Sequence, residues 1–191
     1  GDAAGPCADL LSYGIPIGNF YTTDLDDAKL CIVWGGNWIV THSLTWRKIR
    51  KLRESGARIV VIDPRFTATA SKADEYISIK PGTDMALAIG MMRVIRDEGL
   101  IDKDFMRTYT VAPFLVRQDN GLFLREKDLV NGGSDRCLVW DENNQRAIPI
   151  GEPGLPALNA TCSPNGIGCK TSFSLLCELL DQFPVTKVSK I

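Results

Sequence analysis

The chain has 191 residues, of which 45% are hydrophobic and 24% charged, an ordinary composition for a globular protein with one main core. Its 22 basic and 23 acidic residues give a formal charge of −1, so no global field attracts nucleic acid or an anionic membrane. We therefore expect no nucleic-acid partner and no direct membrane contact, and any ligand must be recognised locally.

The two ends of the chain look like cut points within a longer protein. The chain begins at "GDAAGPC" without an initiator Met and stops at "VTKVSKI". Its first residues lack the regions of a signal peptide, and no apolar run approaches the roughly 20 residues that span a bilayer. We interpret the chain as an internal piece, and its compartment stays open.

The cysteines do not predict a metal centre. None of the six belongs to a Cys-x-x-Cys pair, and the chain has one His, so a zinc or iron–sulfur site built here alone is not expected. Cys31 and Cys177 lie in apolar patterns typical of buried thiols. Cys162 and Cys169 flank a Pro/Gly-rich loop, where two free thiols are favoured over a disulfide.

The first predicted elements are a strand and an amphipathic helix. "LCIVW" (Leu30 to Trp34) is a continuous apolar run, which indicates a strand buried on both faces. A helix capped by Thr41 or Ser43 follows and ends at Gly56, a residue suited to a left-handed C-terminal cap. Three of its residues share an apolar face, and its basic residues are read as a solvated surface rather than a phosphate site. The apolar three are Trp46, Ile49 and Leu52.

Two more strands and a second helix continue the alternation. "RIVVID" (58–63) and "YISI" (76–79) read as strands, with a short helix or turn at "TATASKA" (67–73) between them. A helix from about Asp84 to Glu98 is apolar nearly all round, so we expect burial on most of its sides. Strands that alternate with helices at this spacing predict an α/β fold with a mainly parallel sheet.

Beyond Tyr109 the pattern changes to a period of two. Residues 114–126 predict a β-hairpin that turns at Asn120-Gly121, and residues 136–150 predict another. Residues 151–168 read as a Pro/Gly-rich loop, and a last helix from Ser172 to Phe183 precedes Pro184. We therefore divide one domain into a nucleotide-binding module, residues 1–110, and an extension, residues 111–191, with a β-hairpin, a loop and a C-terminal helix.

The candidate ligand-binding residues lie in three turns. In an open α/β sheet, ligands bind beyond the carboxyl ends of the strands, so the residues after each strand are the informative ones. A different turn follows each of the three predicted strands: Gly35-Gly36-Asn37 after the first, Asp63-Pro64-Arg65 after the second, and Lys80 to Asp84, including Gly82 and Thr83, after the third.

Each turn has chemistry suited to a nucleotide. Gly35 and Gly36 let backbone N–H groups approach a phosphate, and Arg65 can bind phosphate oxygens. Asp63 can accept hydrogen bonds from ribose hydroxyls. Asp84 can accept both parallel donors of a guanine ring.

Each turn also has a purely structural explanation. The glycines fit a plain turn, Asp63-Pro64 a strand end, and Thr83 or Asp84 a helix N-cap. Taken together, the three turns at one sheet edge favour a nucleotide. The strict G-x-G-x-x-G is absent because Asn37 follows the glycines, which weakens an NAD interpretation.

The segments "VWGGNWIVTHS" and "GARIVVIDPRFTATASKADEYISIKPGTDMALAIGMMRVI" strongly resemble the catalytic subunits of the dimethyl sulfoxide reductase family, molybdenum or tungsten oxidoreductases with two molybdopterin guanine dinucleotides. The matching block covers about Asp24 to Tyr109, and its G-x-N, D-P-R and P-G-T-D motifs are highly specific. The resemblance implies a Rossmann-like, three-layer module that holds the guanosine diphosphate end of one dinucleotide. The parent enzyme would then transfer an oxygen atom or two electrons in anaerobic metabolism, often anaerobic respiration.

The resemblance also assigns roles to the residues of the three turns. Gly35 and Asn37 would lie along the pyrophosphate and ribose, Asp63 and Arg65 around the ribose and phosphate, and Gly82 and Asp84 at the guanine. Gly36, Pro64 and Thr83 belong to the same turns. His42 is placed equally as a cofactor contact or as part of a helix start.

Several parts of such an enzyme are expected outside this chain. The resemblance implies an iron–sulfur cluster elsewhere in the parent, and as partners both further domains of the same polypeptide and an iron–sulfur electron-transfer subunit. The metal ligand falls at Gly1 or just upstream, with Asp2 and Cys7 as nearby candidates. We expect the chain alone to be inactive. Its compartment, prokaryotic cytoplasm or periplasm, and its substrate stay open, as do two alternatives: an NAD-binding dehydrogenase domain and a non-catalytic nucleotide-binding module.

Overall fold

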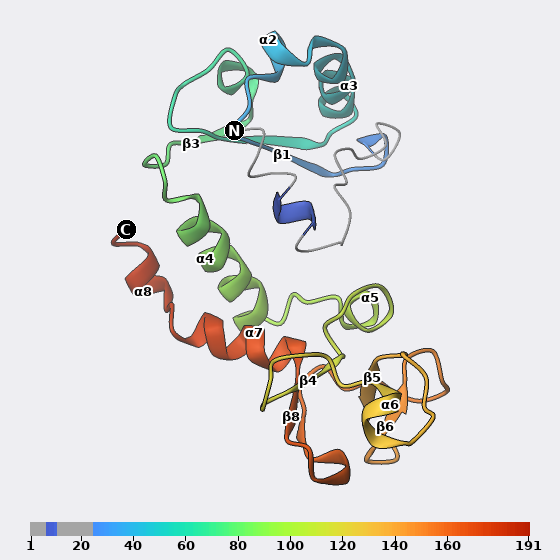
Figure 1. The fold of residues 1–191 in the computed structure, drawn as a ribbon. Helices are drawn as coiled ribbons and strands as arrows, with labels where there is room; N and C mark the ends of the chain where they lie inside the picture. The colour runs from blue at the N-terminus through green and yellow to red at the C-terminus, as the bar shows by residue number, and fades with distance from the viewer. Residues whose placement is uncertain (1–6, 11–24) are drawn as a thin grey trace. The chain divides into compact units, whose positions relative to one another are not determined.

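A computed structural model describes residues 7–10 and 25–191, and it divides the chain into two compact units, one ending at Asp84 and the other beginning at Met85. The fold is mixed α/β: a parallel three-stranded sheet lies in the first unit, and antiparallel strands lie in the second (Figure 1). The predicted combination of a parallel sheet with an antiparallel hairpin is confirmed. No helix among the described residues is both long and apolar enough to span a membrane.

The N-terminal unit is built on three parallel strands in the order β1-β2-β3. Their bounds are Leu30–Trp34 for β1, Arg58–Ile62 for β2 and Glu75–Ile77 for β3. Trp34 pairs with Ile62, which pairs in turn with Ile77, so the carboxyl ends of all three strands reach one edge of the sheet. The turn that follows each strand therefore begins at this edge.

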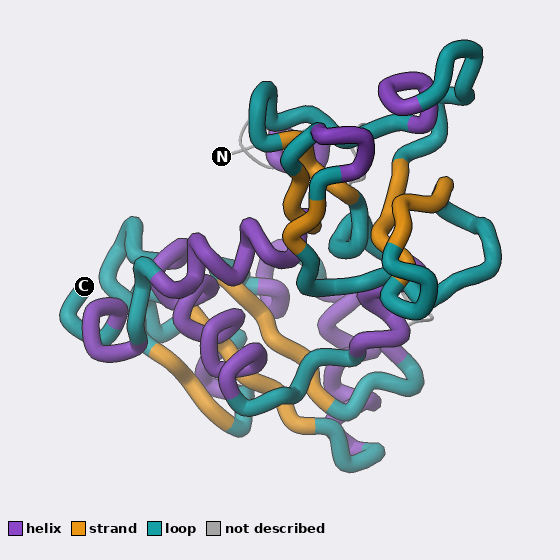
Figure 2. Tube along the Cα trace, turned by 90° about the horizontal axis from the view of Figure 1, so that it is seen from below, coloured by secondary structure: helices purple, strands orange, loops and turns teal. Residues whose placement is uncertain are grey.

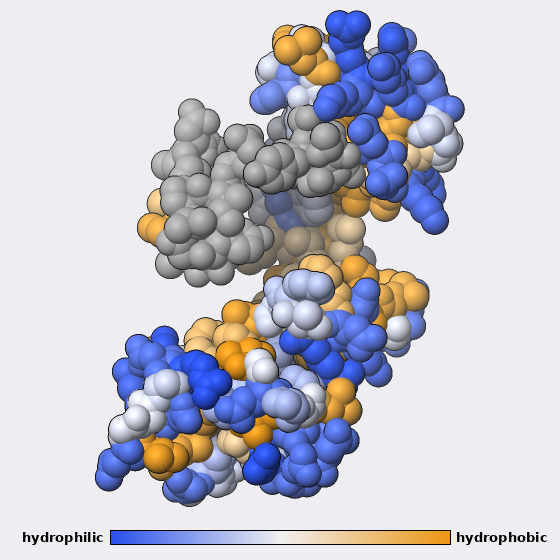
Figure 3. All heavy atoms as spheres, turned by 90° about the vertical axis from the view of Figure 1, so that its right-hand side faces the viewer, coloured by the Kyte–Doolittle hydropathy of each residue, from blue (hydrophilic) through white to orange (hydrophobic). Residues whose placement is uncertain are grey.

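Helix α3 (Ser43–Glu54) covers one face of the parallel sheet (Figure 1). Ile49 and Leu52 of this helix are buried against Cys31 and Val33 of β1, and Trp46 packs on the same cluster. The predicted apolar face of α3 is thus confirmed, and its opposite, basic side gives the hydrophilic surface visible in Figure 3. The exposed cationic side chains there are Arg47, Arg50, Lys51 and Arg53.

The prediction that β1 is buried on both faces is wrong. Its side chains alternate, with Cys31 and Val33 buried, whereas Leu30, Ile32 and Trp34 are 52%, 39% and 36% exposed. The physical reason is that α3 packs on one side of the strand, and a continuous apolar sequence does not state which side will be covered.

A short helix, α2 (Trp38–Thr41), precedes α3, and His42 joins the two. His42, rather than Thr41 or Ser43, is the N-cap of α3, and its side chain makes no capping hydrogen bond. Gly56 has a φ of +100°, as predicted for a left-handed residue after the helix. A 3₁₀ turn, η2 (Ala70–Lys72), forms within the predicted short helix or turn.

The C-terminal unit begins with two helices, α4 (Asp84–Asp97), whose first residue closes the preceding unit, and α5 (Lys103–Tyr109). The bounds of α4 agree with the sequence, but none of its residues is fully buried, so the expected burial on most sides is wrong. Arg93 and Arg96 of α4 donate to the carbonyl oxygens of Leu180 and Cys177 on α7 (Ser172–Asp181).

The antiparallel part of this unit contains two small sheets (Figure 2). The first sheet has the order β4-β8-β7, with β4 at Leu115–Arg117, β8 at Cys169–Thr171 and β7 at Thr161–Cys162. The second sheet is the hairpin of β5 (Leu138–Asp141) and β6 (Arg146–Pro149). The β5–β6 hairpin confirms the prediction for 136–150. Short helical turns complete the unit: α6 (Glu126–Leu129), η3 (Pro164–Gly166) and α8 (Val185–Val188).

Two predictions for this unit need correction. The chain does turn at Asn120-Gly121, with Gly121 at a φ of +73°, but the second arm contributes an isolated bridge at Phe123 while β8 is the main partner of β4. The segment 151–168 is not all loop, because β7 and η3 form within it. Strand β8, which lies far along the chain from β4, pairs with both β4 and β7.

All six cysteines lie within the described residues and are free thiols. Cys162 and Cys169 are cross-strand partners on β7 and β8 rather than loop residues. Burial raises the pKa of the Cys31 thiol and raises that of Cys162 to about 11. Cys7 is exposed, whereas Gly1 and Asp2, the other positions near the predicted metal ligand, fall outside the described residues.

Candidate functional site

The three predicted turns come together at the carboxyl edge of the parallel sheet. Gly35 follows β1 and donates its N–H to the carbonyl oxygen of Ile62 at 2.8 Å, which places it beside the end of β2, where Asp63 follows. Asp63 donates its own N–H to the carbonyl oxygen of Ile77 at 3.2 Å. The turn after β3 is linked to the first strand by Asp84, which accepts a hydrogen bond from Trp34.

The two glycines after β1 serve different purposes. Gly35 has a φ of +62°, and a Cβ built on it would meet nothing within 4 Å, so the residue is required by its backbone conformation and leaves open space. A Cβ on Gly36 would lie 2.6 Å from Nε1 of Trp38. Gly36 is therefore required by the packing of Trp38, a role distinct from the ligand approach predicted for it.

Asn37 is half-buried at the N-cap position of α2, and its side chain faces the segment after β2. Its Oδ1 accepts hydrogen bonds from the N–H of Thr69 at 3.3 Å and from the Thr69 hydroxyl at 3.0 Å. Thr69 is fully buried, so the first turn is attached to a fixed part of the unit.

Asp63 is the buried acid of the edge, with 8% of its surface exposed. Its Oδ1 accepts the N–H of Arg65 at 2.8 Å, an Asx turn that bends the chain around Pro64. The hydroxyl of Tyr76 donates to the carbonyl oxygen of Asp63 at 2.8 Å. The carboxylate and the backbone are both held in place, while Pro64 and Arg65 are exposed.

Arg65 carries an uncommitted positive charge at this edge. Its guanidinium forms no ion pair with any described residue, in contrast to Arg53 and Arg58 on the same unit, which pair with Asp74 and Glu75. An exposed guanidinium next to open backbone offers several N–H donors in a planar arrangement that suits phosphate oxygens.

The turn after β3 leads directly into α4. Gly82 has a φ of +83° and open space at its Cβ position, Thr83 donates its hydroxyl to the carbonyl oxygen of Lys80 at 2.8 Å, and Asp84 is the first residue of the helix. Oδ1 of Asp84 accepts the indole N–H of Trp34 at 2.7 Å. Since each carboxylate oxygen accepts more than one hydrogen bond, this contact orients Asp84 and leaves acceptor capacity on it.

His42 does not join the three turns through any contact among the described residues. Its Nδ1 lies 2.9 Å from the hydroxyl oxygen of Thr41, and its ring is tilted against that of Trp38 at 5.7 Å. The structure thus supports its position at a helix start and leaves a cofactor contact as a prediction.

A neighbouring acid anchors the segment that carries Thr69. Asp74 accepts the N–H of Ile59 at 2.8 Å and pairs with Arg53 at 2.6 Å. The hydrogen bond from Ile59 is the main reason that the pKa of Asp74 lies below its usual range, with the Arg53 contact adding to it. Asp74 therefore attaches the segment between η2 and β3 to Ile59, near the amino end of β2.

Comparison with known proteins places the chain in a family. Residues 6–164 match the family model described as molybdopterin oxidoreductase. The chain belongs to this family. The resemblance to catalytic subunits of the dimethyl sulfoxide reductase family is thereby confirmed.

Individual relatives of this molybdopterin oxidoreductase domain are reductases and dehydrogenases. It is 38% identical over 136 residues, 71% of this chain, to the alpha subunit of perchlorate reductase from Dechloromonas aromatica. It is 33% identical over 72% of this chain to the alpha subunit of dimethylsulfide dehydrogenase from Rhodovulum sulfidophilum. Among solved structures it resembles acetylene hydratase from Pelobacter acetylenicus, with 31% identity over 43% of this chain and 11% of that chain, and a TM-score of 0.39.

The chain is much shorter than these relatives. It spans 14% of the perchlorate reductase relative and 16% of the dimethylsulfide dehydrogenase relative. Within the described residues, no group of three or more His, Cys, Asp or Glu side chains is arranged to hold a metal ion.

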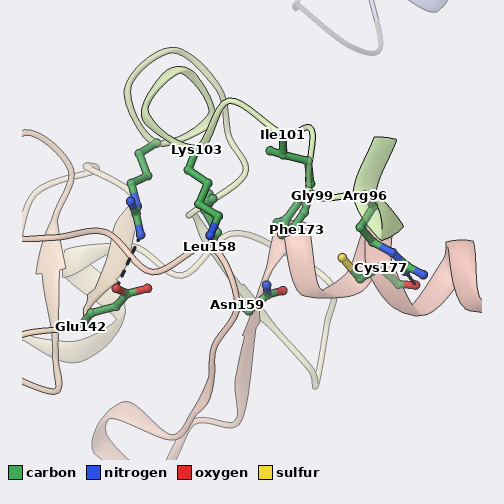
Figure 4. Close-up of a pocket in the computed structure, with 10 residues that line it drawn as sticks. Arg96, Gly99, Ile101, Lys103, Glu142, Leu158, Asn159, Phe173 and Cys177 are labelled. Atoms are coloured by element: carbon green, nitrogen blue, oxygen red, sulfur yellow. Dashed lines mark hydrogen bonds and ion pairs between the residues drawn. The ribbon is translucent and has the colours of Figure 1, made fainter. Parts of the chain in front are cut away.

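A separate hollow in the molybdopterin oxidoreductase domain lies wholly within the C-terminal unit (Figure 4). It has a volume of about 330 Å³ and a partly basic lining. Arg96 there donates to the carbonyl oxygen of Cys177 and to Asp181, and Arg107 donates to the carbonyl oxygen of Pro156. These arginines hold neighbouring segments together, so this hollow is a weaker candidate site than the sheet edge.

Sequence reasoning missed two residues of the site. Thr69 and Trp34 were read as parts of a turn and of a strand, yet they hold Asn37 and Asp84 respectively. No local signal marked Thr69, because its burial and its contact with Asn37 become visible only in the fold. No local signal marked Trp34 as a donor to a residue 50 positions away.

Proposed function

We propose that the carboxyl edge of the parallel sheet binds the guanosine diphosphate end of one molybdopterin guanine dinucleotide. The observation that carries the proposal is the convergence of the three turns, Gly35–Asn37, Asp63–Arg65 and Gly82–Asp84, at one edge, with Asp84 held by Trp34. In this proposal residues 1–110 form a Rossmann-like, three-layer module and residues 111–191 its extension.

The residues of the edge fit such a group in chemistry and in available space. A diphosphate needs donors and positive charge, which the exposed guanidinium of Arg65 offers, and the open space at Gly35 lets the group come close to the chain. A ribose needs acceptors for its hydroxyls, and Asp63 keeps one carboxylate oxygen outside its Asx turn. A guanine presents two parallel donors, which match the carboxylate of Asp84.

The protein residues in this proposal bind and orient; they carry no chemical step. The cofactor, when bound with molybdenum or tungsten, supplies the redox chemistry. The guanidinium of Arg65 offsets the charge of the diphosphate, Gly35 leaves room for it, Asp63 accepts from the ribose, and Asp84 selects the base. Pro64 and Thr83 shape their turns, and His42 borders the first turn.

The greater length of the relatives supports a larger parent protein. We propose that the parent is the catalytic subunit of a molybdenum or tungsten oxidoreductase that transfers an oxygen atom or two electrons. Further domains of that polypeptide would complete the cofactor site, and an iron–sulfur cluster and an electron-transfer subunit would serve it. The relatives named as alpha subunits support this organisation. On this basis the chain alone is expected to show no reductase or dehydrogenase turnover.

Thermal-shift titration of the chain with GDP, ADP and NAD tests the proposal. Selective stabilisation by GDP is expected, because Asp84 pairs with the guanine donors and an adenine lacks them. Asp84→Asn should abolish the preference for GDP over ADP. Asp102→Asn is the matched control, since Asp102 is an acid at the start of another helix, the N-cap of α5, where it accepts the N–H of Phe105. Selective stabilisation by NAD would instead support an NAD-binding domain, and equal responses to all three nucleotides would support a general nucleotide-binding module.

A further inference from the structure

The hydroxyl of Thr69 is used twice inside the N-terminal unit. Thr69 has no exposed surface. Its Oγ1 accepts the N–H of Ile39 at 3.1 Å, in the first turn of α2, and donates to Oδ1 of Asn37 at 3.0 Å. One buried hydroxyl therefore connects the start of α2 with the side chain of the residue that precedes it.

The backbone of Thr69 decides which end of the Asn37 amide faces inward. The N–H of Thr69 lies 3.3 Å from Oδ1 of Asn37, and a main-chain N–H can only donate. The inward atom of the amide must therefore be its oxygen, because an inward Nδ2 group would set its own N–H donors against this main-chain N–H. The orientation of this amide follows from chemistry and not from a choice between similar atoms.

The nitrogen of the Asn37 side-chain amide, unlike its oxygen, is available to bind a ligand. Nδ2 forms no hydrogen bond with any of the residues that the structure describes, and Asn37 is only half-buried. Since the amide oxygen is occupied by two donors from Thr69, Asn37 can recognise a ligand chiefly by donating. A ligand group that fits two N–H donors next to the open backbone of Gly35 is an oxygen acceptor, of which a phosphate oxygen is the strongest kind.

We infer that Thr69 is a positioning residue, which turns the Asn37 amide so that its nitrogen donates to a diphosphate oxygen. This inference rests on the proposed function and deepens it, because it assigns Asn37 to the acceptor-rich diphosphate instead of the ribose hydroxyls. Thr69 itself touches no ligand. It acts through the amide, and without its hydroxyl Asn37 loses the stronger of its two inward contacts and can rotate.

A double-mutant cycle on the affinity for GDP tests the inference. Thr69→Val removes the hydroxyl at nearly constant shape, and Asn37→Ala removes the amide. Each single change should weaken GDP binding about tenfold, the size of one hydrogen bond to a charged group. The double variant should bind no more weakly than Asn37→Ala, because Thr69 has nothing left to position. Thr69→Ser keeps the hydroxyl and should restore affinity to within about twofold of the parent chain.

A second buried threonine separates positioning from stability. Thr171 is also fully buried, and its Oγ1 accepts the N–H of Ser174 and donates to the carbonyl oxygen of Leu158. Thr171→Val should lower the melting temperature of the ligand-free chain about as much as Thr69→Val does. It should leave the affinity for GDP unchanged, since it lies in the C-terminal unit.

The possible outcomes are distinguishable. If Thr69→Val weakens GDP binding equally with and without Asn37, its role is merely structural and the inference is overturned. If Asn37→Ala weakens binding but Thr69→Val does not, the inference fails while the proposed function stands. If the parent chain does not bind GDP at all, the proposed function fails and the inference with it.

Discussion

The sheet edge of the N-terminal unit and the pocket of the C-terminal unit both contain polar and charged side chains, but they differ in how those groups are used. In the pocket, Arg96 and Arg107 donate to carbonyl oxygens and carboxylates of the chain itself. At the sheet edge, Arg65 and the amide nitrogen of Asn37 have no such partners among the described residues. We therefore rank the sheet edge above the pocket as a candidate ligand site, because it keeps hydrogen-bonding capacity after folding.

The largest expected effect is a loss of thermal stability on replacing Asp141, a buried acid of the C-terminal unit. Asp141 has no exposed surface and accepts hydrogen bonds from the N–H groups of Asn143 and Leu155 and from the side chain of Asn144. Asp141→Ala leaves these donors without an acceptor, so we expect the melting temperature to fall by roughly 10 °C. Glu142→Ala, at the exposed neighbouring position, should change it by less than about 2 °C. Scanning calorimetry measures both, and similar values for the two variants would contradict the structural role of Asp141.

A smaller effect is expected at the glycines of the sheet edge. Gly36→Ala places a Cβ against the Trp38 indole, 2.6 Å from Nε1, and should cost about 2 kcal/mol of stability. Gly35→Ala meets no neighbouring atom but must hold a φ of +62°, which costs about 1 kcal/mol. Chemical unfolding of both variants measures the difference. A larger loss at Gly35 than at Gly36 would show that backbone conformation, and not the contact with Trp38, limits this turn.

The third prediction compares Arg65, whose guanidinium has no partner in the described chain, with Arg107, which bonds to the chain itself. Arg65→Gln should weaken GDP binding about tenfold while leaving the melting temperature of the ligand-free chain unchanged, because the guanidinium has no partner in the described chain. Arg107→Gln should do the reverse, lowering the melting temperature by a few degrees with no change in affinity, since its Nε donates to the carbonyl oxygen of Pro156. Calorimetric titration with GDP and a melting curve for each variant supply the comparison. Loss of affinity in Arg107→Gln would move the candidate site toward the pocket.

The smallest expected effect is a dependence of stability on pH. The N–H of Leu155, with the side chain of Asn144, holds the pKa of Asp141 below its usual range. A carboxylate with a lowered folded-state pKa contributes stability that is present above its unfolded pKa, about 3.9, and is lost as the pH falls through the lower folded value. The melting temperature should therefore be flat from about pH 7 to pH 5 and decline below about pH 4. Asp141→Asn should make that decline shallower, and an unchanged decline would show that other carboxylates, such as Asp74, dominate it.

The order of elements and the positions of the three turns could be read from the sequence because they depend on local patterns. Apolar runs and the helix-ending glycines located β1, α3 and α4, and each turn begins where an apolar run stops. The exposed face of β1 could not be read, because an uninterrupted apolar run is the same whether one face or both are covered. Strand β7, two residues long, forms only through its pairing with β8.

The residues that orient the candidate ligand-binding groups could not be predicted from the sequence, because their contacts join distant parts of the chain. Asn37 and Thr69 are separated by 32 positions, and Trp34 and Asp84 by 50. Their hydrogen bonds exist because parallel strands bring distant turns to one edge, and no periodicity in the sequence encodes such a pair. The residues expected to touch a ligand were accessible to motif reasoning, whereas the residues that orient them needed the fold.

The arrangement of β1 at the border of its sheet has a consequence for handling the protein. Among the described residues β1 pairs with β2 alone, and Leu30, Ile32 and Trp34 are exposed along it. A strand with unpaired backbone groups and an apolar face is a template on which another chain can add a strand. We expect concentration-dependent self-association of the chain, which light scattering would detect, and a Lys in place of Ile32 should suppress it without disturbing the turns at the carboxyl edge.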